Sequence, residues 1–206
     1  MVNERRNHWE DVYGGKPATA VSWYQECPEK SLAFIAKSGI SKHDAVIDVG
    51  GGASTLVDHL LDTGYDDVTV LDLAGSAFEQ SRARLGKRAA AVNWVVADVT
   101  QFEPQRRYAV WHDRAVLHFL TNPQDRDRYV AVLRQALASG GHVVIATFGP
   151  DGPLKCSGLE IRRYSVEMLE ELLGPEFELQ ECEIEDHHTP MNSTQQFLYS
   201  RWIRRG

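Results

Sequence analysis

Short apolar runs alternate with segments of helical periodicity across the middle of the chain. Between successive runs, apolar residues recur at the three- and four-residue spacing of a helix face, as in Leu56, Val57, Leu60 and Leu61. The runs typical of buried strands cover residues 45–49, 68–71, 93–96, 108–111 and 142–147. This alternation predicts a parallel sheet built from strand–helix–strand units.

Polar residues mark where several helices should begin. Ser76, with Glu79 three residues later, has the spacing of a capping box. Asn122 and Pro123 have the types expected at the N-cap and first position of a helix over 124–137. We therefore expect helices to follow the second and fourth strands.

The pattern changes after Pro153. One helical segment, residues 166–173, is followed by the helix-ending pair Gly174–Pro175. Two strand-like segments, 177–184 and 195–203, then follow with no helix between them. They predict an antiparallel hairpin at the end of the chain.

Composition limits the class of protein. A chain of 206 residues that is 43% hydrophobic and 25% charged fits one α/β domain. A net charge of -7 argues against a nucleic-acid partner, and no apolar run reaches the length of a membrane span. The cysteines Cys27, Cys156 and Cys182 form no Cys-x-x-Cys pair. We expect a cytoplasmic protein, monomer or homodimer, with no metal site.

The most informative segment lies at the end of the first apolar run. Asp48 is followed by Gly50, Gly51 and Gly52, which let the backbone turn sharply and approach a ligand closely. Ser54 is a candidate N-cap for the next helix. A strand that breaks into such a turn predicts a nucleoside-binding site.

Two features of this turn disfavour a dinucleotide. Thr55 occupies the place of the third glycine in the Gly-x-Gly-x-x-Gly fingerprint. The Asp48 carboxylate would repel a diphosphate. The turn therefore favours S-adenosylmethionine, which has no phosphate, over a nicotinamide cofactor.

Acidic residues also follow the next two strands. Asp72 and Asp98 stand at these strand ends, as Asp48 does at the first. The carboxyl ends of parallel strands form the edge at which open α/β sheets bind ligands. Taken singly, Asp72 could cap a helix and Asp98 could be a turn residue. Together the three acids predict one binding edge.

With these motifs, residues 45–147 resemble a class I S-adenosylmethionine-dependent methyltransferase. The resemblance implies a Rossmann-like, seven-stranded, mostly parallel α/β sheet with helices on both faces and a C-terminal antiparallel strand. In that family the second acid accepts from the ribose hydroxyls, the third accepts from the adenine amino group, and the segment after strand four lies near the methyl group. Gly140–Gly141 resembles the turn before strand five. The implied cofactor residues include Asp48, Gly50, Gly51, Gly52, Asp72, Leu73, Asp98, Val99, Asp113 and Arg114.

The N-terminal segment carries the aromatic residues Trp9, Tyr13, Trp23 and Tyr24. In the thiopurine-methyltransferase-like, small-molecule subgroup that the chain resembles, such a segment folds over the cofactor. We accordingly expect a single domain over 1–206, with a helical lid at 1–40, a cofactor-binding core at 41–150 and a substrate-side region at 151–206. Trp23 and Tyr24 are candidates for contact with the cofactor sulfonium. The alternative is that these rings only pack the segment onto the domain.

Candidate substrate residues lie in the same regions. His118 is the candidate general base, because imidazole titrates near neutrality, although a histidine at such a place is more often structural. Tyr13, Cys156 and Arg163 are the other candidates. Cys156 could instead be a buried thiol, and Arg163 a surface charge.

These observations predict a methyltransferase that transfers a methyl group to a small-molecule acceptor by in-line displacement. One alternative keeps the fold and takes a protein lysine as acceptor, since an acidic surface attracts a basic partner. Another is a nucleoside-binding module without catalysis. A nicotinamide-dependent oxidoreductase is disfavoured by Thr55.

Overall fold

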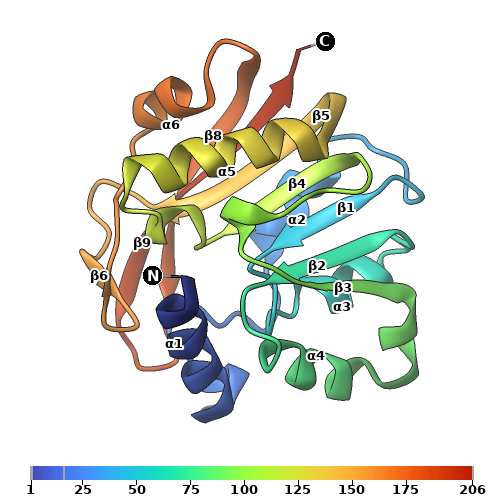
Figure 1. The fold of residues 1–206 in the computed structure, drawn as a ribbon, viewed down its shortest axis with the longest axis vertical. Helices are drawn as coiled ribbons and strands as arrows, with labels where there is room; N and C mark the ends of the chain where they lie inside the picture. The colour runs from blue at the N-terminus through green and yellow to red at the C-terminus, as the bar shows by residue number, and fades with distance from the viewer. Residues whose placement is uncertain (1, 16, 206) are drawn as a thin grey trace.

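The computed structural model describes residues 2–15 and 17–205, which form a sheet with helices on both faces (Figure 1). The main helices are α1 (Val2–Gly15), α2 (Glu29–Ala36), α3 (Leu56–Asp62), α4 (Ala77–Leu85), α5 (Pro123–Ala136) and α6 (Val166–Leu173). The strands of the large sheet are β1 (Val46–Val49), β2 (Val68–Asp72), β3 (Val92–Val96), β4 (Tyr108–Arg114), β5 (Leu137–Phe148), β8 (Phe177–His188) and β9 (Thr194–Arg204). Lys155–Cys156 and Leu159–Glu160 pair as the short ribbon β6–β7.

The large sheet has seven strands in the order β3-β2-β1-β4-β5-β9-β8. Strands β1 to β5 pair in parallel. Strand β9 runs antiparallel to both of its neighbours, β5 and β8. The predicted Rossmann-like class and the predicted terminal hairpin are both confirmed.

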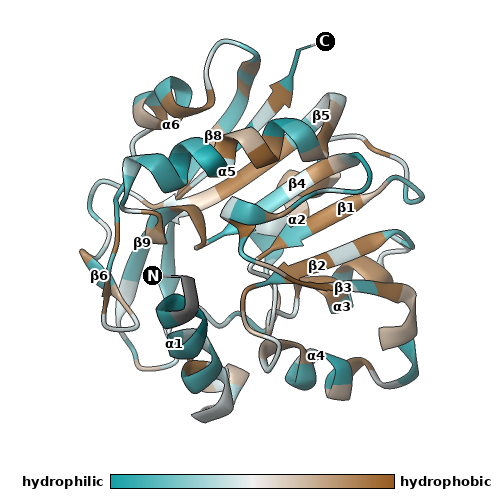
Figure 2. Cartoon of the chain, viewed as in Figure 1, coloured by the Kyte–Doolittle hydropathy of each residue, from teal (hydrophilic) through white to brown (hydrophobic). Residues whose placement is uncertain are grey.

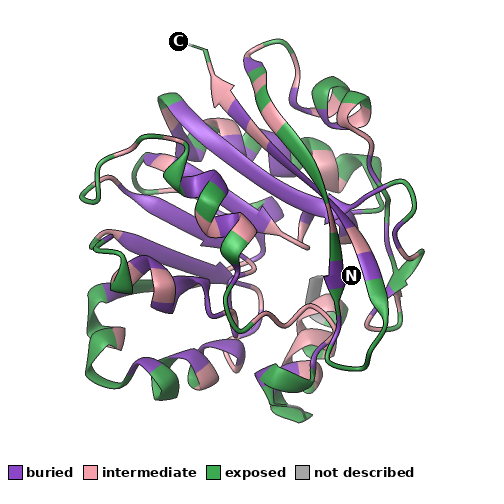
Figure 3. Cartoon of the chain, turned by 180° about the vertical axis from the view of Figure 1, so that it is seen from behind, coloured by how far each residue is buried: buried purple, intermediate pink, exposed green. Residues whose placement is uncertain are grey.

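Both faces of the sheet are covered. Side chains on one face, such as Ile47 and Ile145, pack with Tyr129 and Leu133 of α5 and with α6. The opposite face packs against α2 and α3, which lie behind the sheet in Figure 1. Hydrophobic residues therefore concentrate in the central strands (Figure 2), and those strands are almost wholly buried (Figure 3). This double burial explains the unbroken apolar runs of the sequence.

Strand β5 differs from its prediction. It begins at Leu137, directly after α5, and includes Gly140 and Gly141. Its register with β4 shifts between Tyr108 and Val110, and Gly140 has a φ of 73°. The turn predicted at Gly140–Gly141 is therefore wrong. The glycine instead allows an irregularity inside a longer strand.

The helix starts agree with the sequence in position except at α3, where the N-cap is Thr55 and not Ser54, although Oγ of Ser54 accepts from the N–H of Leu56 at 3.1 Å. The mechanism of capping differs more often. Asn122 accepts from the backbone N–H of Gln124 as predicted. Ser76 is the N-cap of α4, but its side chain makes no capping bond. The capping box is wrong, because Glu10 of α1 accepts from the N–H groups of Gly75 and Ser76 at 2.8 and 3.1 Å. Among the described residues, no helix has the length and apolar character needed to cross a membrane.

Candidate functional site

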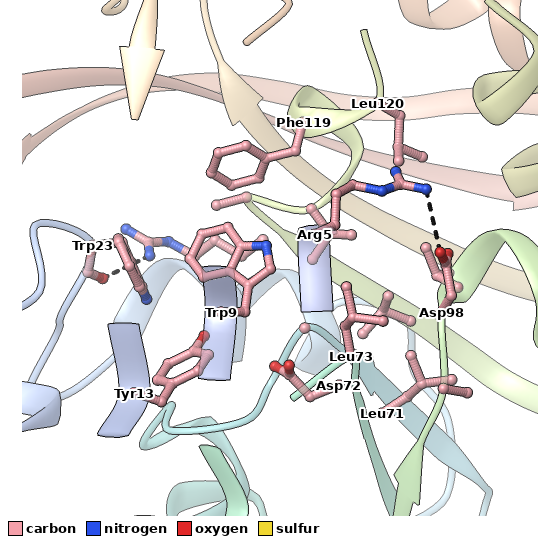
Figure 4. Close-up of a pocket in the computed structure, with 17 residues that line it drawn as sticks. Arg5, Trp9, Tyr13, Trp23, Leu71, Asp72, Leu73, Asp98, Phe119 and Leu120 are labelled. Atoms are coloured by element: carbon pink, nitrogen blue, oxygen red, sulfur yellow. Dashed lines mark hydrogen bonds and ion pairs between the residues drawn. The ribbon is translucent and has the colours of Figure 1, made fainter. Parts of the chain in front are cut away.

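A cleft of about 740 Å³ lies at the carboxyl ends of β1, β2 and β4, beneath helix α1 (Figure 4). The lining combines residues of α1, the strand ends and the segment after β4. These include Arg5, Trp9, Tyr13, Trp23, Gly50, Asp72, Leu73, Asp98, Val99, Arg114, Val116, Phe119 and Leu120. The structure thus brings many of the predicted cofactor residues to one place.

The glycine turn leaves no room for side chains. Gly50 has a φ of 70°, and a Cβ there would lie 2.1 Å from Cγ2 of Val116. A Cβ on Gly52 would lie 2.4 Å from Cβ of Ala77. Close packing and backbone conformation therefore both require glycine after β1.

Asp72 closes the end of β2 and faces the cleft. Its carboxylate accepts from the N–H of Gly52 at 3.1 Å and from the N–H of Ala74 at 2.9 Å. Burial nevertheless raises the pKa of Asp72 to about 7, because desolvation outweighs these hydrogen bonds. The carboxylate therefore gains or loses its proton near neutrality.

Asp98 has a different set of partners. Oδ1 accepts from the N–H and hydroxyl of Thr100 at 2.8 and 2.7 Å. Oδ2 pairs with Nη2 of Arg5 at 3.2 Å (Figure 4), and Arg5 also pairs with Asp125 at 3.4 Å. A helix at the start of the chain thus reaches the end of β3.

Trp9 fills the centre of the cleft roof (Figure 4). Its ring meets those of Phe119 and Trp23 edge-on, with centroids 5.0 and 5.8 Å apart. Tyr13 lies one turn further along α1, its ring centroid 6.0 Å from that of Trp9. Arg5 and Trp9 were not among the residues predicted to form the site. The only feature of the sequence that indicated a role for α1 was its cluster of aromatic residues.

A second cavity, of about 530 Å³, adjoins the first. Tyr13, Trp23, Gly50 and Arg114 border both cavities. The second cavity is further lined by residues of β1, the glycine turn, α2, β4 and the segment before α2. These include Tyr24, Ser31, Asp48, Gly51 and His112.

Arg114 lies at the boundary between the cavities. Its Nε donates to the hydroxyl of Tyr199 at 2.8 Å, and its Nη1 donates to the carbonyl of Trp23 at 2.8 Å. The guanidinium also lies over the ring of Phe197, 4.5 Å from its centroid. Its Nη2 is buried and has no hydrogen-bond partner among the described residues. A bound anion would satisfy it.

Some predicted site residues lie outside the linings of both cavities, including Gly52, which supports the turn through its bond to Asp72. The Asp113 carboxylate is buried and accepts from Tyr129 and from the backbone of Val116, so it shapes the turn after β4. Cys156 is buried, and burial raises the pKa of its thiol. Arg163 is exposed and donates to the carbonyl of Gly152 at 3.3 Å.

His118 is also outside both linings and fully buried. Its ring packs between those of Phe119 and Phe148, and its Nδ1 accepts from the N–H of Phe148 at 3.3 Å. Burial, with a smaller effect of Arg114, lowers the pKa of His118 to about 3. The imidazole therefore stays neutral and belongs to the packing beside the site.

This burial predicts an acid-sensitive fold. The unfolded histidine titrates near 6.5 but the folded one near 3, so the unfolded state binds more protons between these values and stability falls as the pH drops below 6.5. Between pH 7.5 and 5 the wild type should lose about 2 kcal/mol more than His118→Gln, at about 1.4 kcal/mol per pH unit. Urea unfolding of both proteins at each pH measures this. Equal losses would show that His118 is not held neutral.

Comparison with known proteins agrees with this geometry. Residues 46–141 match the family model of a methyltransferase domain. The chain is 27% identical over 142 residues to the eEF1A lysine and N-terminal methyltransferase of Mus musculus. This match covers 66% of this chain and 20% of that protein. It is 32% identical over 80 residues to nodulation protein S of Rhizobium tropici, covering 39% of this chain and 33% of the relative. The chain thus spans about a fifth to a third of these relatives' lengths.

Solved structures share the whole fold. The 1,6-didemethyltoxoflavin-N1-methyltransferase of Burkholderia thailandensis has a TM-score of 0.71 at 20% identity, covering 99% of this chain and 85% of that one. The N-methyltransferase NodS of Bradyrhizobium japonicum has a TM-score of 0.72 at 16% identity, covering 96% and 98%. The family match includes the glycine turn and the ends of β2 and β3. The chain therefore has the fold of class I S-adenosylmethionine-dependent methyltransferases, and its residues 46–141 match a methyltransferase domain.

Proposed function

We propose that this protein transfers the methyl group of S-adenosylmethionine to a small-molecule acceptor by in-line displacement. The observation that carries the proposal is the grouping of Asp48, Asp72 and Asp98 around a glycine turn at the edge of the sheet. Carboxylates suit the hydroxyls, amino groups and ammonium of this cofactor, whereas they would repel the diphosphate of a dinucleotide.

The cavities suggest how the cofactor would lie. The adenosine would occupy the first cavity, with its ribose hydroxyls at Asp72 and its adenine near Asp98 and Val99. The amino-acid end would enter the second cavity, between Asp48 and Arg114. Tyr13 and Trp23 border both cavities, so their rings would flank the sulfonium, where cation–π attraction is favourable.

The bound cofactor supplies an activated methyl group on a sulfonium. The residues of this chain then have to orient the acceptor and exclude water, and orientation alone contributes roughly 7–11 kcal/mol to such reactions. Helix α1 provides much of that enclosure, through Trp9 above the cleft and through the bonds that Glu10 accepts from the N–H groups of Gly75 and Ser76 just before α4. A general base is needed only for an acceptor that carries a proton, and the buried His118 is poorly placed to be one.

A protein acceptor is the second candidate. The similarity to the eEF1A lysine and N-terminal methyltransferase favours it, and a net charge of -7 would attract a basic partner. The position of α1 favours a small molecule instead, because this helix lies over the cleft and would hinder the approach of a folded protein. Incubation with labelled cofactor and either a small-metabolite extract or a protein extract separates the two. Transfer of the label to protein would show a protein acceptor and refute the proposed small-molecule acceptor.

Titration calorimetry tests the cofactor directly. We expect S-adenosylhomocysteine to bind at micromolar concentration, near -8 kcal/mol, and reduced nicotinamide cofactor not to bind. Binding of the nicotinamide alone would refute the proposal. Cofactor binding without methyl transfer to any acceptor would favour a nucleoside-binding module.

Asp72 gives this binding a predictable pH dependence. Ribose hydroxyls donate to the ionised carboxylate, and the pKa of Asp72 is raised to about 7. Affinity for S-adenosylhomocysteine should therefore fall about tenfold from pH 8 to pH 6. Asp72→Asn should bind more weakly at pH 8, by about 1–3 kcal/mol, and show little of this pH dependence. If the variant kept the wild-type pH profile, Asp72 would not contact the cofactor.

A further inference from the structure

A series of buried polar side chains connects β1, β4 and α2 beneath the second cavity. Oδ1 of Asp48 lies 2.7 Å from Nδ1 of His112, and Nε2 of His112 lies 2.9 Å from Oγ of Ser31. Asp48 and His112 are 2% exposed, and Ser31 is 0% exposed. With Nδ1–H donating to the carboxylate, a neutral imidazole leaves Nε2 to accept from the serine hydroxyl. The imidazole is thus held from both sides.

The series continues from Ser31 to Arg114. Ser31 interacts with the hydroxyl of Tyr199, and that hydroxyl accepts from Nε of Arg114 at 2.8 Å. The series therefore links the Arg114 guanidinium with the Asp48 carboxylate. Both of these charged groups border the second cavity.

Each end of the series has an unused polar atom. Oδ2 of Asp48 and Nη2 of Arg114 are buried without hydrogen-bond partners among the described residues. Buried polar groups without partners are costly, so such atoms in a cavity lining indicate a ligand that satisfies them. An acceptor oxygen and a donor nitrogen in the lining of one cavity match the ammonium and carboxylate of an amino acid.

We propose that His112 is a positioning residue for the amino-acid end of the cofactor. It holds Oδ1 of Asp48 so that Oδ2 is left for the ammonium, and through Ser31 and Tyr199 it orders Asp48 together with Arg114. His112 does not itself need to contact the cofactor. This inference rests on the proposed function, because it concerns the same cofactor.

The proposal predicts different effects on the binding of two ligands that share an adenosine. S-Adenosylhomocysteine carries the amino acid, whereas 5′-methylthioadenosine has the adenosine and the thioether without it. A residue that acts through Asp48 should affect the first ligand alone. A residue that only maintains the fold should weaken both ligands equally.

Calorimetry with both ligands on the full chain tests this. His112→Leu removes the donor to Asp48, and a hydrogen bond to a charged group corresponds to a loss of about tenfold or more. We expect that loss for S-adenosylhomocysteine and less than about a twofold change for 5′-methylthioadenosine. His112→Asn keeps an N–H near the position of Nδ1, so it should restore most of the affinity.

Further variants keep the test decisive. Ser31→Ala removes a single hydroxyl, and it should shift the ratio of the two affinities in the same direction even if His112→Leu does not fold. Equal weakening of both ligands, or a His112→Asn variant as weak as His112→Leu, would overturn the positioning role. If the wild type binds neither ligand, the proposed function itself fails, so the two failures are distinguishable.

Discussion

Gly52→Ala should weaken binding of S-adenosylhomocysteine at least about a hundredfold. The added Cβ would lie 2.4 Å from Cβ of Ala77 and 2.6 Å from Oδ2 of Asp72. Ala77 is fully buried in α4, and backbone N–H groups hold Asp72, so neither can move aside easily. Overpacking of this kind costs about 1–3 kcal/mol in the protein itself. Displacement of the turn would also break the Gly52–Asp72 hydrogen bond at the floor of the cleft.

Gly14→Ala is the matched control for this variant. A Cβ on Gly14, near the end of α1, has no atom within 4 Å, and the residue lies in helical backbone. The same chemical change there should leave affinity within about twofold, as surface substitutions usually do. Calorimetry and thermal unfolding of both variants measure the contrast. Wild-type affinity in Gly52→Ala would show that the cofactor does not use this turn.

The glycine turn also shows why the core of the site could be predicted from sequence. Parallel strands end at one edge of a sheet, so acids that follow successive apolar runs must lie near one another. Asp48, Asp72 and Asp98 all line the two cavities. The order of strands and helices from β1 to β5 was also predicted correctly, because apolar strand runs alternate there with helical periodicity.

The extent of the outer strands was harder to predict. Strand β8 continues past Ile184 to His188, although Glu185 and Asp186 are polar. Pairing with β9, such as Asp186 opposite Gln196, extends the strand there. Backbone hydrogen bonds to a neighbouring strand require no particular side chains, so the alternation of hydrophobic and polar residues does not predict where such a strand ends.

The contribution of α1 could not be predicted for a related reason. The helix is polar on most sides, and its important contacts are with distant residues: Arg5 and Asp98 are 93 positions apart. Glu10 replaces the expected side-chain cap of Ser76. Hydrogen bonds of Gln80 with the carbonyl of Tyr13 and the N–H of Ala18 add to the attachment. Such contacts depend on where α1 packs, which no local pattern specifies.

Asp113 illustrates how a residue next to a site can matter through the fold alone. Its carboxylate accepts from the N–H groups of Val116 and Leu117 and from the hydroxyl of Tyr129. Val116 in turn lies against Gly50, where an added Cβ would come within 2.1 Å of it. The carboxylate therefore fixes the turn that forms one wall of the cleft. The family resemblance predicted that Asp113 contacts the cofactor, but in the structure its carboxylate bonds to groups inside the domain.

We therefore expect Asp113→Ala to lower the free energy of unfolding by about 3–5 kcal/mol, because it leaves several buried donors without an acceptor. Asp113→Asn keeps one acceptor oxygen and should lose about half as much. Asp127→Ala, at an exposed position of α5, should change stability by less than about 0.5 kcal/mol. Urea unfolding at pH 8 measures all three, since the pKa of Asp113 is raised to about 6 by burial and the carboxylate is ionised there.

The pH dependence gives a second readout. Because the folded pKa of Asp113 is raised above its ordinary value of 3.8, the folded state binds more protons between these values, and this residue's contribution to stability decreases as the pH rises toward 6. Asp113→Asn cannot titrate, so its deficit relative to the wild type should be larger at pH 5 than at pH 8. A constant deficit, or a stable Asp113→Ala variant, would mean that the donors find other acceptors and that the turn after β4 does not depend on this carboxylate.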